Sequence, residues 1–205
     1  KIGPNYLPGH GHADALSFEI SLFGSRFIVN SGISTYNVSN ERQMQRGTSM
    51  HSTINIDNKD SSELWSAFRV GRRANIKEIK INQKDSLNIS ASHDGYYRLF
   101  GKPCHCREWI FSDNQLKLLD TVLGHGFHKI ESVLPLGPEV EIIKIQNNKV
   151  ELCIQNQTII ILFNSNGHLE LINSKYFIGF GQSLNNQHLV LNYEGNLPFT
   201  SSIEF

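Results

Sequence analysis

Two histidines and a carboxylate lie close together in the segment Gly9–Asp14, which reads Gly-His-Gly-His-Ala-Asp. Side chains two residues apart point to the same side of an extended chain, so His10, His12 and Asp14 would share one face. Imidazole and carboxylate groups at the end of an apolar face can bind a metal ion or carry out acid–base chemistry. Glycines on both sides of His10 would let a ligand approach the backbone closely.

An isolated His-x-His is more often a pair of exposed loop histidines, so the surrounding sequence has to decide. Alternating residues in Leu16–Leu22 predict a strand that returns, after a turn, as Arg26–Asn30. Asn30 would then end near the start of the histidine strand, and His51 would open the next strand after a long loop. Three chain segments could therefore bring polar groups to one end of the sheet.

Short alternating runs separated by polar turn residues continue through the rest of the chain. The further predicted strands are Thr53–Asp57, Ile76–Ile81, Leu87–Ser92, Arg107–Phe111, Leu116–Leu123, Lys129–Leu134, Val140–Gln146, Val150–Gln155, Thr158–Phe163, Leu169–Ile172, Tyr176–Phe180 and Leu189–Tyr193. A helix is expected only at Ser39–Arg46, with Ser39 or Asn40 as its N-cap. This pattern predicts an all-β fold, a many-stranded antiparallel β-sandwich of two sheets, as a single domain over residues 1–205.

The composition argues against several classes of protein. Equal numbers of basic and acidic residues, 19 of each, disfavour a nucleic-acid binder. No apolar run approaches the roughly 18 residues that span a membrane. The three cysteines, Cys104, Cys106 and Cys153, form no complete disulfide framework and are interpreted as structural thiols. The first residues resemble the middle of a chain, so we expect a fragment of a longer protein.

Cupins also carry His-x-His in a β-barrel, and they bind metal through it. Their motif places a glutamate soon after the second histidine, whereas Glu19 lies seven residues after His12 and on the opposite strand face. The later cupin histidine is also missing after Pro135-Leu-Gly137. Cupin chemistry is therefore a poor fit.

The order and spacing of several motifs resemble those of the heparinase II/III family. The matching stretches are Gly9–Glu19 with its His-x-His, Asp and Ser-Phe, the strand Phe27–Gly32, Tyr36, the arginines Arg42 and Arg46, the strand His51–Asp57, His93–Tyr96 and His105–Arg107. The resemblance spans roughly residues 3 to 125. Each motif alone is weak, but their order is specific.

The resemblance implies a two-part enzyme. Family members carry an N-terminal α/α toroid followed by a β-sandwich, and they cleave acidic, uronate-containing polysaccharides by β-elimination between the two parts. This chain would be the C-terminal sandwich without its toroid, and by itself it should be inactive or nearly so. The family also implies a periplasmic or other extracytoplasmic location in a bacterium.

The resemblance also implies roles for individual residues. His10 and Tyr36 correspond to catalytic groups, and His12, Asn30 and His51 correspond to zinc ligands. The family more usually has aspartate at Asn30, and zinc prefers a carboxylate to an amide oxygen, so we expect a weak or empty zinc site. Arg42 and Arg46 would share a helix face and could bind a substrate carboxylate or sulfate.

Two other functions remain open from the sequence. The chain could be a non-catalytic glycan-binding module of a surface-polysaccharide biosynthesis system, such as one for capsule or O-antigen. It could also be a purely structural sandwich that stabilises a partner domain. A lyase predicts an unsaturated uronate product, a binding module predicts glycan binding without turnover, and a structural domain predicts neither.

Overall fold

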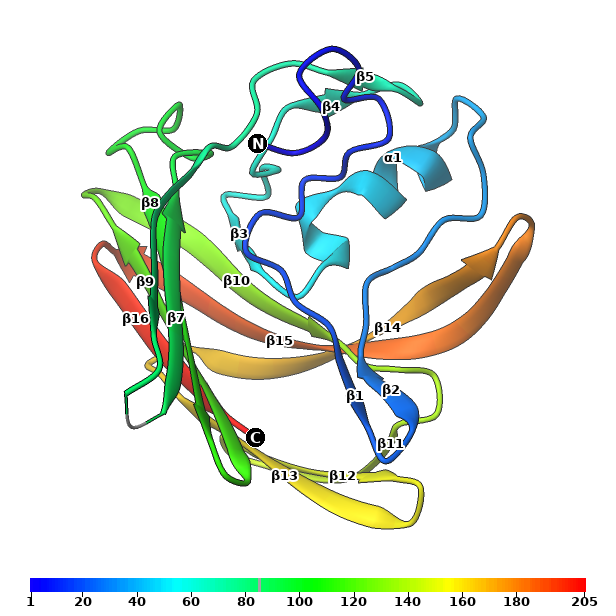
Figure 1. The fold of residues 1–205 in the computed structure, drawn as a ribbon, viewed down its shortest axis with the longest axis vertical. Helices are drawn as coiled ribbons and strands as arrows, with labels where there is room; N and C mark the ends of the chain where they lie inside the picture. The colour runs from blue at the N-terminus through cyan, green and yellow to red at the C-terminus, as the bar shows by residue number, and fades with distance from the viewer. Residues whose placement is uncertain (85) are drawn as a thin grey trace.

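Two large antiparallel sheets form the body of the computed structural model, which describes residues 1–84 and 86–205 (Figure 1). The larger sheet contains β6 (Ile76–Asn82), β7 (Leu87–His93), β8 (Cys104–Ser112), β9 (Gln115–Leu123), β11 (Glu141–Gln146), β12 (Lys149–Ile154), β13 (Gln157–Asn164) and β16 (Phe199–Glu204), in the order β11-β12-β13-β16-β9-β8-β7-β6. The smaller contains β3 (Ile54–Ile56), β10 (Phe127–Pro135), β14 (His168–Gly179) and β15 (Gln182–Asn196), in the order β14-β15-β10-β3.

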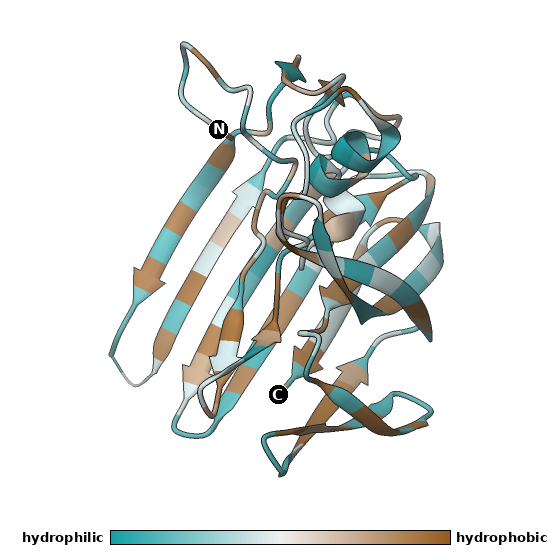
Figure 2. Cartoon of the chain, turned by 90° about the vertical axis from the view of Figure 1, so that its right-hand side faces the viewer, coloured by the Kyte–Doolittle hydropathy of each residue, from teal (hydrophilic) through white to brown (hydrophobic). Residues whose placement is uncertain are grey.

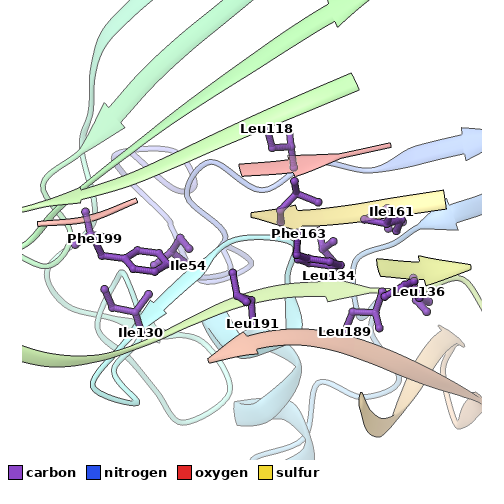
Figure 3. Packing of buried hydrophobic residues seen from close by; sticks show 14 of the residues in the cluster. Ile54, Leu118, Ile130, Leu134, Leu136, Ile161, Phe163, Leu189, Leu191 and Phe199 are labelled. Carbon is purple, nitrogen blue, oxygen red and sulfur yellow. The ribbon is translucent and has the colours of Figure 1, made fainter. Parts of the chain in front are cut away.

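The core lies between the inner faces of these two sheets. Hydrophobic and hydrophilic residues alternate along the strands in Figure 2, as expected for sheets with one buried face. Leu134 and Leu191 of the smaller sheet and Leu118 and Phe163 of the larger sheet belong to one buried cluster (Figure 3). This arrangement confirms the predicted all-β, antiparallel sandwich.

Most of the predicted hairpins are present, and their turns contain the predicted residues. Asp113-Asn114 joins β8 to β9, and Asn147 and Asn156, both at positive φ, join β11 to β12 and β12 to β13. The only α-helix in the part of the chain that the structure describes is α1 (Asn40–Arg46), and the Ser39 side chain caps it by accepting a hydrogen bond from the backbone of Arg42. The helix prediction is confirmed, with Ser39 as the N-cap.

Some predicted elements are wrong in extent. Only Ile20–Leu22 of the predicted first strand is β1, because Leu16 has a φ of 60° and breaks the extended path. It pairs with β2 (Ser25–Ile28). The runs predicted at Leu169–Ile172 and Tyr176–Phe180 form one long strand, β14, which ends at Gly179 and leaves Phe180 in the following turn. The polar strand β16 and the short β4 (Leu64–Trp65) and β5 (Arg69–Val70) were not predicted.

The outer face of the smaller sheet supports the irregular part of the chain. Along β15, Leu189 and Leu191 point into the core, so His188, one residue before Leu189, points to the opposite face. Helix α1, the 3₁₀ turn η1 (Thr48–Met50) and the preceding loops lie on that outer side (Figure 1). No helix among the described residues is long and apolar enough to cross a membrane.

Candidate functional site

The two histidines of the His-x-His motif point to different partners. The backbone turns at this motif, where Gly11 N–H donates to Pro8 O at 2.9 Å, so the expectation of a shared strand face is wrong. The exposed His10 ring packs edge-on against Tyr36, with centroids 5.2 Å apart. His12 instead turns inward, and its Nδ1 lies 3.3 Å from Nε2 of His51.

The His12 segment forms no regular strand ladder. It is held instead by side chains from η1 and from the residues after it. Thr48 Oγ1 donates to Ala13 O at 2.7 Å, and Thr53 Oγ1 donates to Ala15 O at 2.7 Å. Because these bonds tie the segment after His12 to both sides of His51, the two imidazoles are brought together although they are 39 residues apart.

Asn30 contacts the far side of the His51 ring. Its amide nitrogen donates to Oε1 of Glu19, which leaves the amide oxygen, 2.6 Å from Nδ1 of His51, as an acceptor. Nδ1 of His51 must therefore carry the proton, and Nε2 is left with a lone pair. His12 Nδ1–H can donate to that lone pair, so Glu19, Asn30, His51 and His12 form one directional chain.

Both inward histidines are neutral at pH 7. Burial, followed by the charges of Arg42 and Arg46, lowers the pKa of His12 to about 4. Burial, followed by the neighbouring His12 and His188, lowers the pKa of His51 to about 3. Neither imidazole can act as a proton donor through its cationic form near neutral pH.

His188 lies under this pair on the outer face of the smaller sheet. Burial lowers its pKa to about 4, and its Nε2 has no hydrogen-bond partner in the described structure. A buried nitrogen without a partner costs free energy. The sequence analysis missed His188 because it lies outside the motifs, although a lone histidine directly before the apolar run Leu189–Leu191 was a usable signal.

The donor set fits a zinc ion only in part. The facing nitrogens of His12 and His51 are neutral and suitably placed for one ion, but the Asn30 oxygen lies at the opposite nitrogen of His51. Within residues 1–84 and 86–205, no cluster of three His, Cys, Asp or Glu side chains could hold a metal. Asn30 is therefore placed to orient the His51 ring through Nδ1, the nitrogen that faces away from His12.

Arg42 and Arg46 share a helix face, as predicted, but that face is buried. Arg46 donates from Nε to Gly11 O at 3.1 Å and from one terminal nitrogen to Ala67 O at 3.0 Å, which fastens the loop that carries His10. The Arg42 side chain has a single hydrogen bond, from Nε to Ala67 O at 3.2 Å, and both of its terminal nitrogens lack partners. Substrate binding by these arginines stays a prediction. Arg42 has two terminal nitrogens without a hydrogen-bond partner, whereas Arg46 has one.

A buried ion pair of the larger sheet ties the two site loops together. Arg107 of β8 forms a two-point contact with Asp120 of β9, at 2.7 and 2.9 Å. Its remaining terminal nitrogen donates to Leu16 O at 2.9 Å and to Ser52 O at 2.5 Å. Because Leu16 follows the His12 loop and Ser52 follows His51, Arg107 positions both loops through their backbone carbonyls.

Two further aromatic residues pack against the His10–Tyr36 pair, and neither was predicted as a site residue. Phe68 lies 5.4 Å from the His10 ring and comes from the turn between β4 and β5. Phe180 lies 5.0 Å from the Tyr36 ring and comes from the turn between β14 and β15. Only the fold brings these turns to the motif, because nothing in the local sequence marks them.

Comparison with known proteins identifies the fold. A family model described as heparinase II/III-like, C-terminal, matches residues 1–203. The structure is similar to heparan sulfate lyase HepC from Pedobacter heparinus, with a TM-score of 0.77 and 16% identity over 95% of this chain and 30% of that one. It is also similar to a structure of heparinase III, with a TM-score of 0.72 and 17% identity over 96% of this chain and 30% of that one. No curated protein sequence matches the chain.

Proposed function

Since the chain belongs to the heparinase II/III-like family as its C-terminal domain, we propose that it forms one side of the active site of a polysaccharide lyase acting on uronate-containing polymers. The chain spans about a third of the length of the structures that it resembles, covering 30% of each. The activity proposed is therefore that of the full-length protein, in which an N-terminal toroid would supply the other wall of the cleft.

The residues around His10 support the proposal because they are of the types that β-elimination requires. A base removes the proton next to the uronate carboxylate, an acid protonates the leaving oxygen, and positive charge stabilises the anion that develops. His10 and Tyr36 are in contact, with ring centroids 5.2 Å apart, and both reach solvent. The Arg42 guanidinium lies 5.1 Å from the centre of the Tyr36 ring.

The contact between His10 and Tyr36 is the observation that carries this proposal. These are the two titratable groups of the site that a substrate can reach, whereas His12 and His51 are shielded and neutral. We assign the proton transfers to His10 and Tyr36, and the positioning of the loop to His12 and His51. No step in this assignment requires a metal ion.

The test uses the full-length protein and a panel of uronate polymers. We expect an unsaturated product that absorbs in the ultraviolet, and we expect His10→Ala to lower kcat by at least about 100-fold, the usual contribution of a general acid–base group. His168→Ala is a matched control, because His168 is exposed on β14 and takes part in none of the site contacts above. Absence of product across the panel, or unchanged activity in His10→Ala, would overturn the proposal. Glycan binding without product would favour the non-catalytic module.

A further inference from the structure

Three exposed aromatic side chains form a continuous surface beside His10, here called the aromatic rim: Tyr36, Phe68 and Phe180. The Tyr36 ring lies 5.5 Å from Phe68 and 5.0 Å from Phe180. Their exposed fractions are 38% for Tyr36, 44% for Phe68 and 63% for Phe180, so each ring offers surface to a ligand. Three separate chain segments contribute one ring each.

The turn that carries Phe180 is fastened to the Tyr36 loop by backbone contacts. Phe177 N–H donates to Ser31 O at 2.8 Å, and Gly181 N–H donates to Ser34 O at 2.9 Å. Gly32, at a φ of +75°, allows this approach, because a Cβ there would lie only 2.0 Å from Phe177 O. Figure 1 shows the long β14–β15 hairpin rising beside α1. The position of Phe180 is therefore built into the fold.

A buried positive charge with unused donors lies beneath the rim. The Arg42 guanidinium lies 5.1 Å from the Tyr36 ring centre and 5.7 Å from that of Phe68. Its side chain is fully buried, yet both terminal nitrogens lack hydrogen-bond partners. A buried, incompletely paired cation is costly, and an anionic group held on the rim would offset part of that cost.

We propose that the aromatic rim is a saccharide-binding subsite, in which Phe180 and Phe68 contact the apolar face of a sugar ring of an acidic glycan. The ring's carboxylate or sulfate lies on the side of Arg42 and is attracted by its charge, which gives the subsite a preference for acidic over neutral sugars. The sugar bound there is adjacent to His10, so the rim sets the register of the chain at the reacting bond. This inference rests on the proposed function for its substrate class.

The experiment measures binding of uronate oligosaccharides to the full-length protein by calorimetry, alongside KM and kcat on the polymer. We expect Phe180→Ala to raise Kd and KM about tenfold with little change in kcat, which corresponds to about 1.4 kcal/mol and lies within the range of an aromatic contact. Phe180→Trp should bind at least as well as the original protein. Phe180→Leu keeps an apolar side chain but removes the flat ring, and we expect it to bind nearly as weakly as Phe180→Ala.

Phe127→Ala is the matched control, because Phe127 is 66% exposed on β10 and lies outside the rim. Equal Kd values for Phe180→Ala and Phe127→Ala, or full affinity in Phe180→Leu, would overturn the inference. The same holds if neutral oligosaccharides of equal length bind as tightly as acidic ones. Product formation with no effect of Phe180→Ala would refute the rim and leave the lyase intact. Binding that depends on Phe180 without any product would refute the lyase and leave the rim intact.

Discussion

The side-chain oxygen of Asn30 lies 2.6 Å from Nδ1 of His51, on the side of the ring opposite to His12. This hydrogen bond fixes the protonated nitrogen of His51 and leaves its other nitrogen facing His12. We expect histidine-selective ¹⁵N NMR to find His51 protonated at Nδ1 between pH 6 and 8, about three units or more above its lowered pKa. A proton on Nε2 of His51 would contradict the geometry.

Asn30→Leu should show what the hydrogen bond contributes. Nδ1–H of His51 would remain buried without an acceptor, so we expect a loss of about 1–3 kcal/mol in the free energy of unfolding, measured by urea denaturation. Asn148→Leu is the control, because Asn148 lies in the exposed turn between β11 and β12. An equal effect of both substitutions would mean that Asn30 does not hold His51.

Removal of metal should leave the fold unchanged. Because the Asn30 oxygen is directed to the far nitrogen of His51, the site offers two facing ligands rather than three. We expect purified, dialysed protein to contain well under one zinc per chain by elemental analysis, and a chelator to leave Tm unchanged. One zinc per chain, together with a lower Tm after chelation, would contradict this expectation.

Acid should destabilise the protein before the carboxylates titrate. The pKa values of His12, His51 and His188 are lowered to about 4, about 3 and about 4 in the folded state, against about 6.5 when unfolded. The unfolded chain therefore binds more protons below pH 6.5, so stability falls as the pH drops from about 6.5 towards 4. Each of these three histidines can contribute up to about 1.4 kcal/mol per pH unit in that window. Urea denaturation at a series of pH values measures the slope, and a flat profile would contradict the assignment.

His188→Leu isolates one of these contributions. Its Nε2 is buried without a partner, so an apolar side chain of similar size should be neutral or stabilising at pH 7. The gain should be larger at pH 5, because the unfolded state of the variant no longer takes up that proton. His125→Leu is the comparison, since His125 is exposed in the turn before β10. Destabilisation by His188→Leu at both pH values would contradict this, because it would mean that His188 makes a stabilising hydrogen bond.

Arg107→Met should be severely destabilising. Burial raises the pKa of the Asp120 carboxyl, but Arg107 and His105 outweigh this effect and hold the pKa well below its usual value. The substitution would leave this fully buried carboxylate without its main counter-charge. Breaking such a pair costs about 3–5 kcal/mol. Lys117→Ala, which breaks the partly exposed pair with Glu204, should cost less than about 1 kcal/mol. Urea denaturation measures the loss of unfolding free energy in both variants, and similar losses would contradict the role of the Arg107–Asp120 ion pair.

Alternation in the sequence was enough to predict the sandwich, because a two-residue period is a local consequence of burying one face of a strand. The same logic failed between His10 and Leu16, where turns and a positive φ replace the extended chain. The predicted sharing of a face by His10 and His12 was wrong for that reason. The motif order still indicated segments that the structure brings together, since it depends on residue identity and not on strand parity.

The sequence by itself determined the fold class, the family and the segments that carry His10, Tyr36 and His51, since these follow from local patterns and residue types. Tertiary structure decided which groups meet. It separated the exposed His10 from the half-buried His12, turned Asn30 to the far nitrogen of His51, and brought Phe180 to Tyr36 from 144 residues further along the chain. Those contacts depend on how sheets and loops pack over long sequence distances, and local sequence patterns do not determine that packing.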